Sequence, residues 1–84
     1  DESGWYLMKD IRINADDAKR LKADTAFTDF IQDVRNEQIR LFTTSAAQDI
    51  EVREEAHAVL RALTKIEVQL DAAIMAETLL DRKQ

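Results

Sequence analysis

The clearest hydrophobic pattern lies in the middle of the chain, where apolar residues recur at intervals of three or four positions. Gln38 shares this stripe with the apolar residues Phe27, Phe30, Ile31, Val34, Leu41 and Phe42. Such spacing is typical of one face of an α-helix. It predicts a helix over residues 25–42, roughly 27 Å long at about 1.5 Å per residue. Asp24 stands directly before it and is a residue type preferred at the N-cap.

A second and longer pattern fills the C-terminal half. Thr43 and Thr44 interrupt the first stripe, and Ser45 with Gln48 three residues later has the form of a capping box. Residues 46–82 contain neither Gly nor Pro and are rich in strong helix formers. Their apolar residues repeat every seven positions in two columns: Ala56, Leu63 and Leu70 in one, and Val59, Ile66, Ala73 and Leu80 in the other. We expect one helix over 46–82, about 55 Å long.

The N-terminal residues show no comparable repeat. Residues 1–13 hold the only glycine and are expected to form an extended arm, whose Trp5 and Tyr6 dock on this chain or on a neighbour. Asn14 resembles an N-cap, which predicts a short helix over 15–23. The chain is thus expected to consist of the arm 1–13 and one helical domain over 14–84.

These predicted lengths do not match. A helix of about 27 Å folded back on one of about 55 Å covers only half of it. Leu70, Ile74, Leu79 and Leu80 are then left in water, where each forfeits about 1.5–3 kcal/mol of burial. We therefore expect an oligomer or a larger assembly, with an interface made by Leu63, Leu70, Ile74, Leu79, Leu80, Trp5 and Tyr6. The alternative is a kink near 72–73 that folds the tail back.

Composition supports an all-α fold. The 84 residues include one Gly and no Pro, so the tight turns of a many-stranded fold are improbable. The expected architecture is a short helix plus an antiparallel helical hairpin with one long C-terminal helix, completed by oligomerisation as in a coiled coil. No apolar run is long enough to cross a bilayer, and the acidic N-terminus is not typical of a secretion signal. A net charge of −5 argues against nucleic acid as a partner.

One set of side chains has the pattern of a metal site. Glu54 and His57 form Glu-x-x-His, and Glu37 lies a similar distance before the expected turn. This set resembles two-helix ferritin-like proteins, and the resemblance implies a di-iron site built across a dimer from Glu37, Glu54 and His57. The alternative is that Glu54 is solvated and that His57 is a boundary residue. No cofactor other than iron is suggested, and no nucleophile–base pair is present, so an enzyme other than a ferroxidase is not expected.

A wider resemblance covers residues 15–83. The succession Leu21-x-x-Asp24-x-Ala26-Phe27, Val34-Arg35-x-Glu37, the segment from Thr44 to His57, and Leu60-x-Ala62-Leu63 resembles small helical proteins encoded among the head and packaging genes of tailed bacteriophages. The resemblance implies a non-enzymatic virion or assembly protein, located in the host cytoplasm during assembly or in the virion. Its partners would be further copies or other virion proteins.

Three functions therefore compete. The first is a phage structural or assembly subunit that acts through helix–helix contacts, and the second is the ferritin-like metal-binding module. The third is a small acidic inhibitor or adaptor of a host protein, which the charge of −5 permits.

Overall fold

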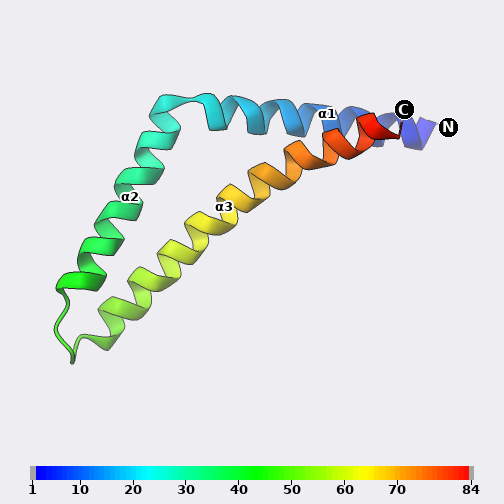
Figure 1. The fold of residues 1–84 in the computed structure, drawn as a ribbon. Coiled ribbons are helices and arrows are strands. Elements are labelled where there is room, and N and C mark those ends of the chain that lie inside the picture. Colours follow the sequence, from blue (N-terminus) through cyan, green and yellow to red (C-terminus); the bar gives the residue numbers. More distant parts are fainter. Residues whose placement is uncertain (1, 84) are drawn as a thin grey trace.

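The chain forms three helices, as expected for an all-α protein. The computed structural model describes residues 2–83, apart from the side chains of residues 2, 3 and 5. The helices are α1 (Glu2–Ala23), α2 (Thr25–Thr44) and α3 (Ile50–Arg82). Helix α3 is one continuous helix, which confirms the long C-terminal element, and its tail does not fold back at 72–73 (Figure 1).

The predicted arm over residues 1–13 is wrong, because α1 runs without interruption from Glu2 to Ala23. Asn14 is therefore an interior residue of α1 and no N-cap. The physical reason is a column of packing residues that includes small ones: Met8, Ile11, Ala15 and Ala18 recur at helical spacing, and the two alanines are buried. The prediction failed because only Met8 and Ile11 carry this column within residues 2–13, and two positions give no clear helical repeat.

The junction between α1 and α2 forms without glycine or proline. Asp24 adopts an extended conformation (φ −79°, ψ 111°), and its carboxylate accepts a hydrogen bond from the amide of Phe27 at 3.1 Å. This confirms the expected N-cap and satisfies one of the free amides of the first turn. The chain changes direction sharply here, so that α1 and α2 form the two sides of a corner (Figure 1).

The loop between α2 and α3 differs from the predicted capping box. Ser45 ends α2, where its hydroxyl donates to the carbonyl of Phe42 at 2.9 Å, and α3 begins only at Ile50. Asp49 accepts from the amide of Ala46 at 3.1 Å, and the Arg53 guanidinium donates to the Ala46 carbonyl at 2.5 Å. These contacts fold residues 46–49 into a short loop and so shorten α3 relative to the predicted 46–82.

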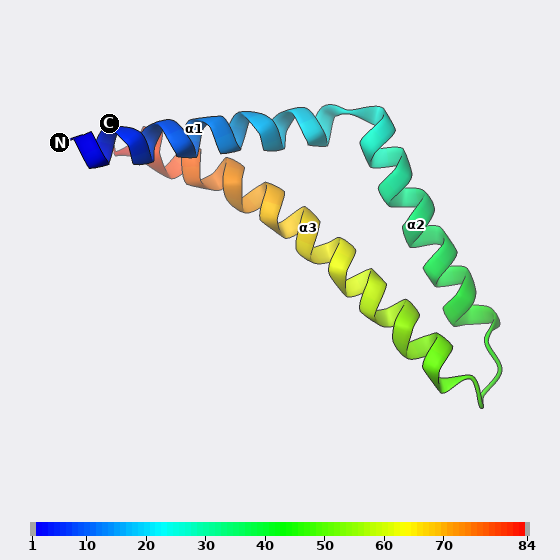
Figure 2. The same ribbon diagram turned by 180° about the vertical axis from the view of Figure 1, so that it is seen from behind.

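Helix α3 spans both of the other helices. It lies against α2 near the loop and against α1 toward its own C-terminal end, so the beginning of α1 and the end of α3 share one end of the molecule (Figures 1 and 2). Helix α1, about 33 Å long, supplies the length that α2 lacks. Consequently Leu70, Ile74 and Leu80 are only partly exposed, which corrects the expectation that this half of α3 is left uncovered.

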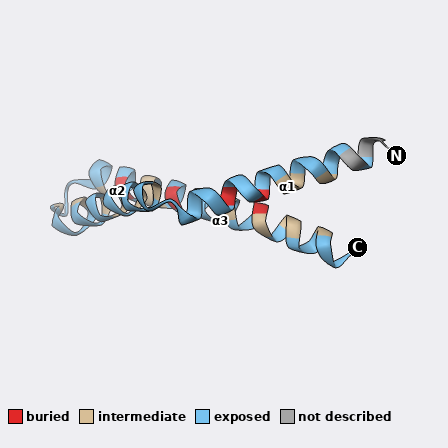
Figure 3. Cartoon of the chain, turned by 90° about the horizontal axis from the view of Figure 1, so that it is seen from above, coloured by how far each residue is buried: buried red, intermediate tan, exposed pale blue. Residues whose placement is uncertain are grey.

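The buried core is small. Within the described residues it consists of Leu63 and four alanines: Ala15, Ala18, Ala56 and Ala73. Buried positions of α1 and α3 meet where these two helices cross, and the helices diverge from there toward the termini (Figure 3). The alanines permit this crossing because they allow two helix backbones to approach closely. No described side chain larger than Leu63 is buried.

The molecule is correspondingly open and long. Its radius of gyration is 17.9 Å and its extents are 59 × 24 × 18 Å, whereas a compact chain of this length has a radius of gyration of about 12 Å. The accessible surface is 6490 Å², against about 5,100 Å² for a compact monomer of this mass. The fold therefore exposes roughly 1,400 Å² more surface than a compact monomer does.

Candidate functional site

The three predicted metal ligands do not form a cluster in this structure. The Glu37 carboxylate accepts two hydrogen bonds from Arg40, at 2.5 and 3.0 Å, and these contacts lower its pKa. Glu54 and His57 are exposed and line a shallow surface depression with Phe42, Ile50 and Arg53. The part of the chain that the structure describes contains no group of three His, Asp or Glu side chains placed to hold a metal ion. An iron site shared between two copies remains a prediction.

Of the predicted interface residues, Leu63 packs within the chain, at 6% exposure. Leu70, Ile74 and Leu80 are half-buried, and Leu79 is exposed. The Tyr6 side chain is also exposed, while the side chain of Trp5 lies outside the described part of the chain. Within this set, Leu63 therefore belongs to the buried core, whereas Leu79 and Tyr6 lie on the surface of the chain.

One edge of the fold is lined by ion pairs between helices. Lys19 of α1 approaches Glu77 of α3 at 2.6 Å, and Arg12 approaches Asp81 at 2.9 Å. The hydrogen bond and the negative charge of Glu77 raise the pKa of Lys19. The remaining pairs of this edge are Lys22 with Asp71, Arg35 with Glu67, and Arg12 with Glu77 at 3.7 Å. We call these residues the charged edge.

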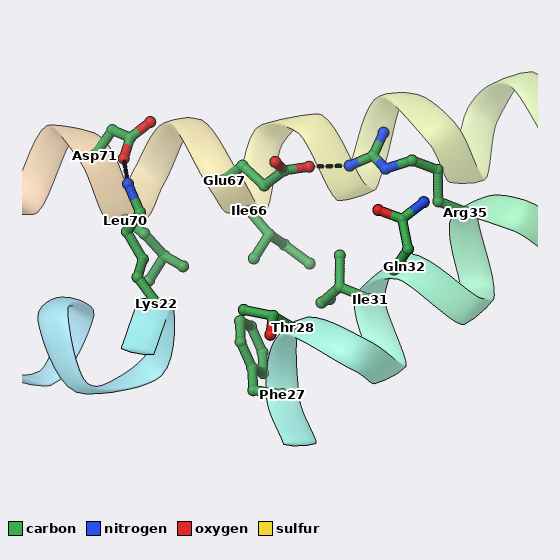
Figure 4. A pocket seen from close by; sticks show the side chains of 10 residues that line it. All are labelled: Lys22, Phe27, Thr28, Ile31, Gln32, Arg35, Ile66, Glu67, Leu70 and Asp71. Atoms are coloured by element: carbon green, nitrogen blue, oxygen red, sulfur yellow. Dashed lines mark hydrogen bonds and ion pairs between the residues drawn. The ribbon is translucent and has the colours of Figure 1, made fainter. Parts of the chain in front are cut away.

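A hollow of about 200 Å³ lies beside the corner, between α2 and α3. Ile31 and Ile66 point toward each other across it, and the pairs Lys22–Asp71 and Arg35–Glu67 lie along its rim (Figure 4). Such a rim stays hydrated, because exposed ion pairs interact strongly with water. The charged edge is therefore a hydrated side of the fold.

The opposite side of the same helices carries several exposed apolar side chains. Successive residues of a helix are rotated by about 100°, so Phe30 and Arg35 lie on either side of the inward-facing Ile31. In the same way, Ile66 and Glu67 lie on either side of the inward-facing Leu63. Two antiparallel helices are related by a local two-fold axis that is perpendicular to the plane containing both helices. Residues that are rotated in the same direction about their own helix axis, away from the inward-facing residue, therefore lie on the same side of the pair.

The Arg35–Glu67 ion pair fixes which side carries the charges. By the same rotation, Phe30 and Val34 of α2 are displaced away from Arg35, and Val52, Val59 and Ile66 of α3 are displaced away from Glu67, although Ile66 also reaches into the hollow. We call these five residues the apolar flank: Phe30, Val34, Val52, Val59 and Ile66. Phe30 is 71% exposed, Ile66 43%, and Val34 and Val52 40% each, while Val59 is half-buried.

The apolar flank was only partly visible in the sequence. The column Val59, Ile66, Ala73 and Leu80 was recognised, and Phe30 and Val34 were assigned to the helix stripe. Which face of each helix turns inward depends on the path of α1, and that path was not predicted. Val52 extends the column by one further heptad and could have been found from its spacing alone.

Comparisons with known proteins add no relative: no family model, no curated protein and no solved structure matches this chain. Among the described helices, none combines the length and the apolar character needed to cross a bilayer. Because no relative indicates a site, the candidate functional site is chosen from the surface residues of the structure. We take the apolar flank as that site.

Proposed function

We propose that this chain is a non-enzymatic helical subunit that works by protein–protein contact and becomes part of a larger assembly. The observation that carries the proposal is the contrast between the buried core and the exposed apolar surface. A single leucine and four alanines are buried among the described residues, while large side chains such as Phe30, Tyr6 and Val68 are more than half exposed.

Energetics favours an associated state. Burying one large apolar side chain contributes about 1.5–3 kcal/mol, and a chain of this length has a total stability of only about 4–13 kcal/mol. Burying a few exposed side chains in a complex therefore contributes a free energy similar to the total free energy of unfolding of the single chain. Large exposed apolar patches mark interaction sites in soluble proteins, and the apolar flank is the candidate for such a patch in this chain.

The type of assembly is proposed from the sequence. The resemblance to small helical proteins of tailed-bacteriophage head and packaging genes supports a virion or virion-assembly component. The open, elongated shape fits a subunit that packs against neighbours along its length. In this proposal its partners are further copies and other virion proteins, and contact is made through helices.

Thermal unfolding followed by circular dichroism over a hundredfold range of protein concentration tests the proposal. Because association stabilises the folded state by mass action, the midpoint is expected to rise with concentration. A chain that unfolds at one temperature throughout this range, and that sediments as a monomer, would contradict the proposal. Mass spectrometry of purified phage particles that carry the gene tests the virion assignment, and absence of the chain from particles and assembly intermediates would contradict it.

A further inference from the structure

We propose that ion pairs hold α1 on α3 as a latch, and that raised ionic strength releases α1 about a hinge at Asp24 while α2 and α3 stay packed together. The proposal goes beyond the proposed function, because it concerns a rearrangement within one chain and requires no partner. Three observations carry it: the distribution of the interhelical ion pairs, the kind of side chain buried between the helices, and the way α1 is joined to α2.

The ion pairs of the charged edge are distributed unevenly between the helices. Of the five pairs that define this edge among the described residues, four join α1 to α3, and the fifth, Arg35–Glu67, joins α2 to α3. In every pair the basic residue lies on α1 or α2 and the acidic residue lies on α3. Helix α1 therefore makes most of the contacts between opposite charges that hold this fold together.

Glu77 is the centre of these contacts. Its carboxylate lies 2.6 Å from the Lys19 ammonium and 3.7 Å from the Arg12 guanidinium, and its side chain is only 12% exposed. Arg12 extends the network to Asp81 at 2.9 Å. Isolated surface ion pairs contribute little to stability, whereas charges that form a network contribute more. Without α1, Glu77 and Asp81 are like charges four positions apart on one helix, which is an unfavourable arrangement.

The apolar part of the α1 contact is built around small side chains. The buried residues of α1 in the described part of the chain, Ala15 and Ala18, are both alanines. The one large buried side chain among the described residues, Leu63, lies where α2 packs on α3. Because the free energy of burial rises with the apolar area removed from water, screening the charges weakens the contact of α1 more than the contact of α2.

The two ends of α2 are connected in different ways. A single residue, Asp24, joins α1 to α2, and its carboxylate bonds forward to the Phe27 amide of α2 at 3.1 Å. The loop at the other end is tied to α3, because the Arg53 guanidinium donates to the carbonyls of Ala46 and Ala47 at 2.5 and 2.9 Å. Hinges are a few residues at the ends of elements that absorb a change in φ and ψ. The hinge is therefore at Asp24 and not at the loop.

Release of α1 changes the surface that the chain presents. Ile74 and Leu80, which are half-buried in this structure, become accessible together with the carboxylates of Glu77 and Asp81. Helix α1 loses its packed face at the same time. Since most helix stability in proteins comes from tertiary packing, the amides of α1 are then expected to exchange with solvent faster than those of the other helices.

Hydrogen exchange of the whole chain, followed by mass spectrometry, tests the proposal. The exchange is compared at about 0.01 M and about 1 M sodium chloride, where the Debye length falls from about 30 Å to about 3 Å. Peptides from residues 8–23 are expected to exchange at least about tenfold faster at high salt, while peptides from residues 56–66 change by less than about twofold. The response should be the same at two protein concentrations, because the movement occurs within one chain.

Two matched variants separate the latch from a general effect of charge. Glu77→Gln removes the carboxylate shared by Arg12 and Lys19, whereas Glu37→Gln removes a carboxylate that pairs with Arg40 inside α2. At low salt, Glu77→Gln is expected to bring the exchange of α1 close to its rate at high salt, and Glu37→Gln is expected to leave it unchanged.

An exchange of charges tests the pair nearest the hinge. Lys22→Glu and Asp71→Lys each place like charges opposite one another and should accelerate exchange in α1. The double variant restores opposite charges and should return the rate toward that of the native chain. Failure of the double variant to slow exchange relative to both single variants would count against the latch.

Three outcomes of the salt experiment overturn the proposal. If salt accelerates all three helices equally, the fold opens as one unit. If the exchange of α1 does not respond to salt, or is the same in Glu77→Gln and Glu37→Gln, the ion pairs do not hold α1. If the salt response depends on protein concentration, it reports association between copies. Each of these results leaves the proposed function standing.

Discussion

Truncating Leu63 is the sharpest test of the core, because it is the only large side chain among the buried described residues, at 6% exposure. Leu→Ala substitutions in cores cost about 2–5 kcal/mol, which combines lost burial with the cavity left behind. Val59 and Leu60, next to Leu63 on α3, are half-buried, so the structure around the site relaxes more easily than a closed core does. We therefore expect Leu63→Ala to cost about 2–3 kcal/mol.

That loss lowers the folding equilibrium constant roughly 30- to 150-fold. It is a large part of the about 4–13 kcal/mol available to a chain of this length. Urea unfolding at one fixed protein concentration measures the change, and holding the concentration constant keeps any association equal between variants. Val68→Ala is the control: Val68 is 60% exposed on the same helix, and the expected change is within about 0.5 kcal/mol. If Leu63→Ala costs no more than Val68→Ala, the packing between α2 and α3 described above is incorrect.

Three further predictions concern the corner, the crossing and the charged edge. Asp24→Ala removes the N-cap of α2 and is expected to cost about 1 kcal/mol in urea unfolding, whereas Asp24→Asn should retain most of the stability; equal losses would contradict the capping role. Ala15→Leu forces a large side chain into the crossing, where Ala15 is 0% exposed, and should cost about 1–3 kcal/mol. The same change at the exposed Ala58 should cost little, and no difference in thermal midpoint between the two would argue against a close crossing. The Lys19 pKa, raised by Glu77, should fall toward its ordinary value in Glu77→Gln when followed by nuclear magnetic resonance. This contact stabilises the fold fully below the ordinary lysine pKa, and the contribution is lost as the pH rises through the raised value. A Lys19 pKa that does not respond to Glu77→Gln would show that the contact is absent in solution.

The sequence predicted those elements in which large apolar residues carry the periodic signal. The stripe that contains Phe27 and Ile31 gave α2 to within two residues, and Asp24 gave its beginning. The heptad columns of α3 gave a continuous long helix. In these segments local helix propensity and the hydrophobic pattern point to the same answer, so no tertiary information was needed.

Elements that depend on small residues or on tertiary contacts were not predicted. The first half of α1 packs through only two partly buried apolar residues, Met8 and Ile11, and Arg12 pairs with Asp81, a residue far away in the sequence. Neither feature produces a strong periodic signal. The start of α3 was placed too early because the capping box at Ser45 competes with the loop that Asp49 and Arg53 stabilise.

The sequence predicted that an exposed apolar surface exists, but it did not predict where on the fold this surface lies. The mismatch in helix lengths indicated an exposed apolar surface on α3 and an oligomer, and it placed that surface on the second half of the helix. Because α1 is longer than expected and covers that half, the uncovered part of the column moves to Val52 and Ile66, beside Phe30. Association through an exposed apolar surface therefore stays a prediction, and the surface concerned is a different one from that predicted.

Small-angle X-ray scattering of the native chain tests the central claim most directly, because it reports mass and shape in one measurement. We predict a forward scattering that corresponds to more than the single-chain mass of 9.7 kDa, reduced toward the single-chain value by Phe30→Glu. A native chain that scatters with a mass of 9.7 kDa at every concentration, whether as open as the 17.9 Å radius of gyration described above or more compact, would contradict the claim that this chain associates through its apolar flank.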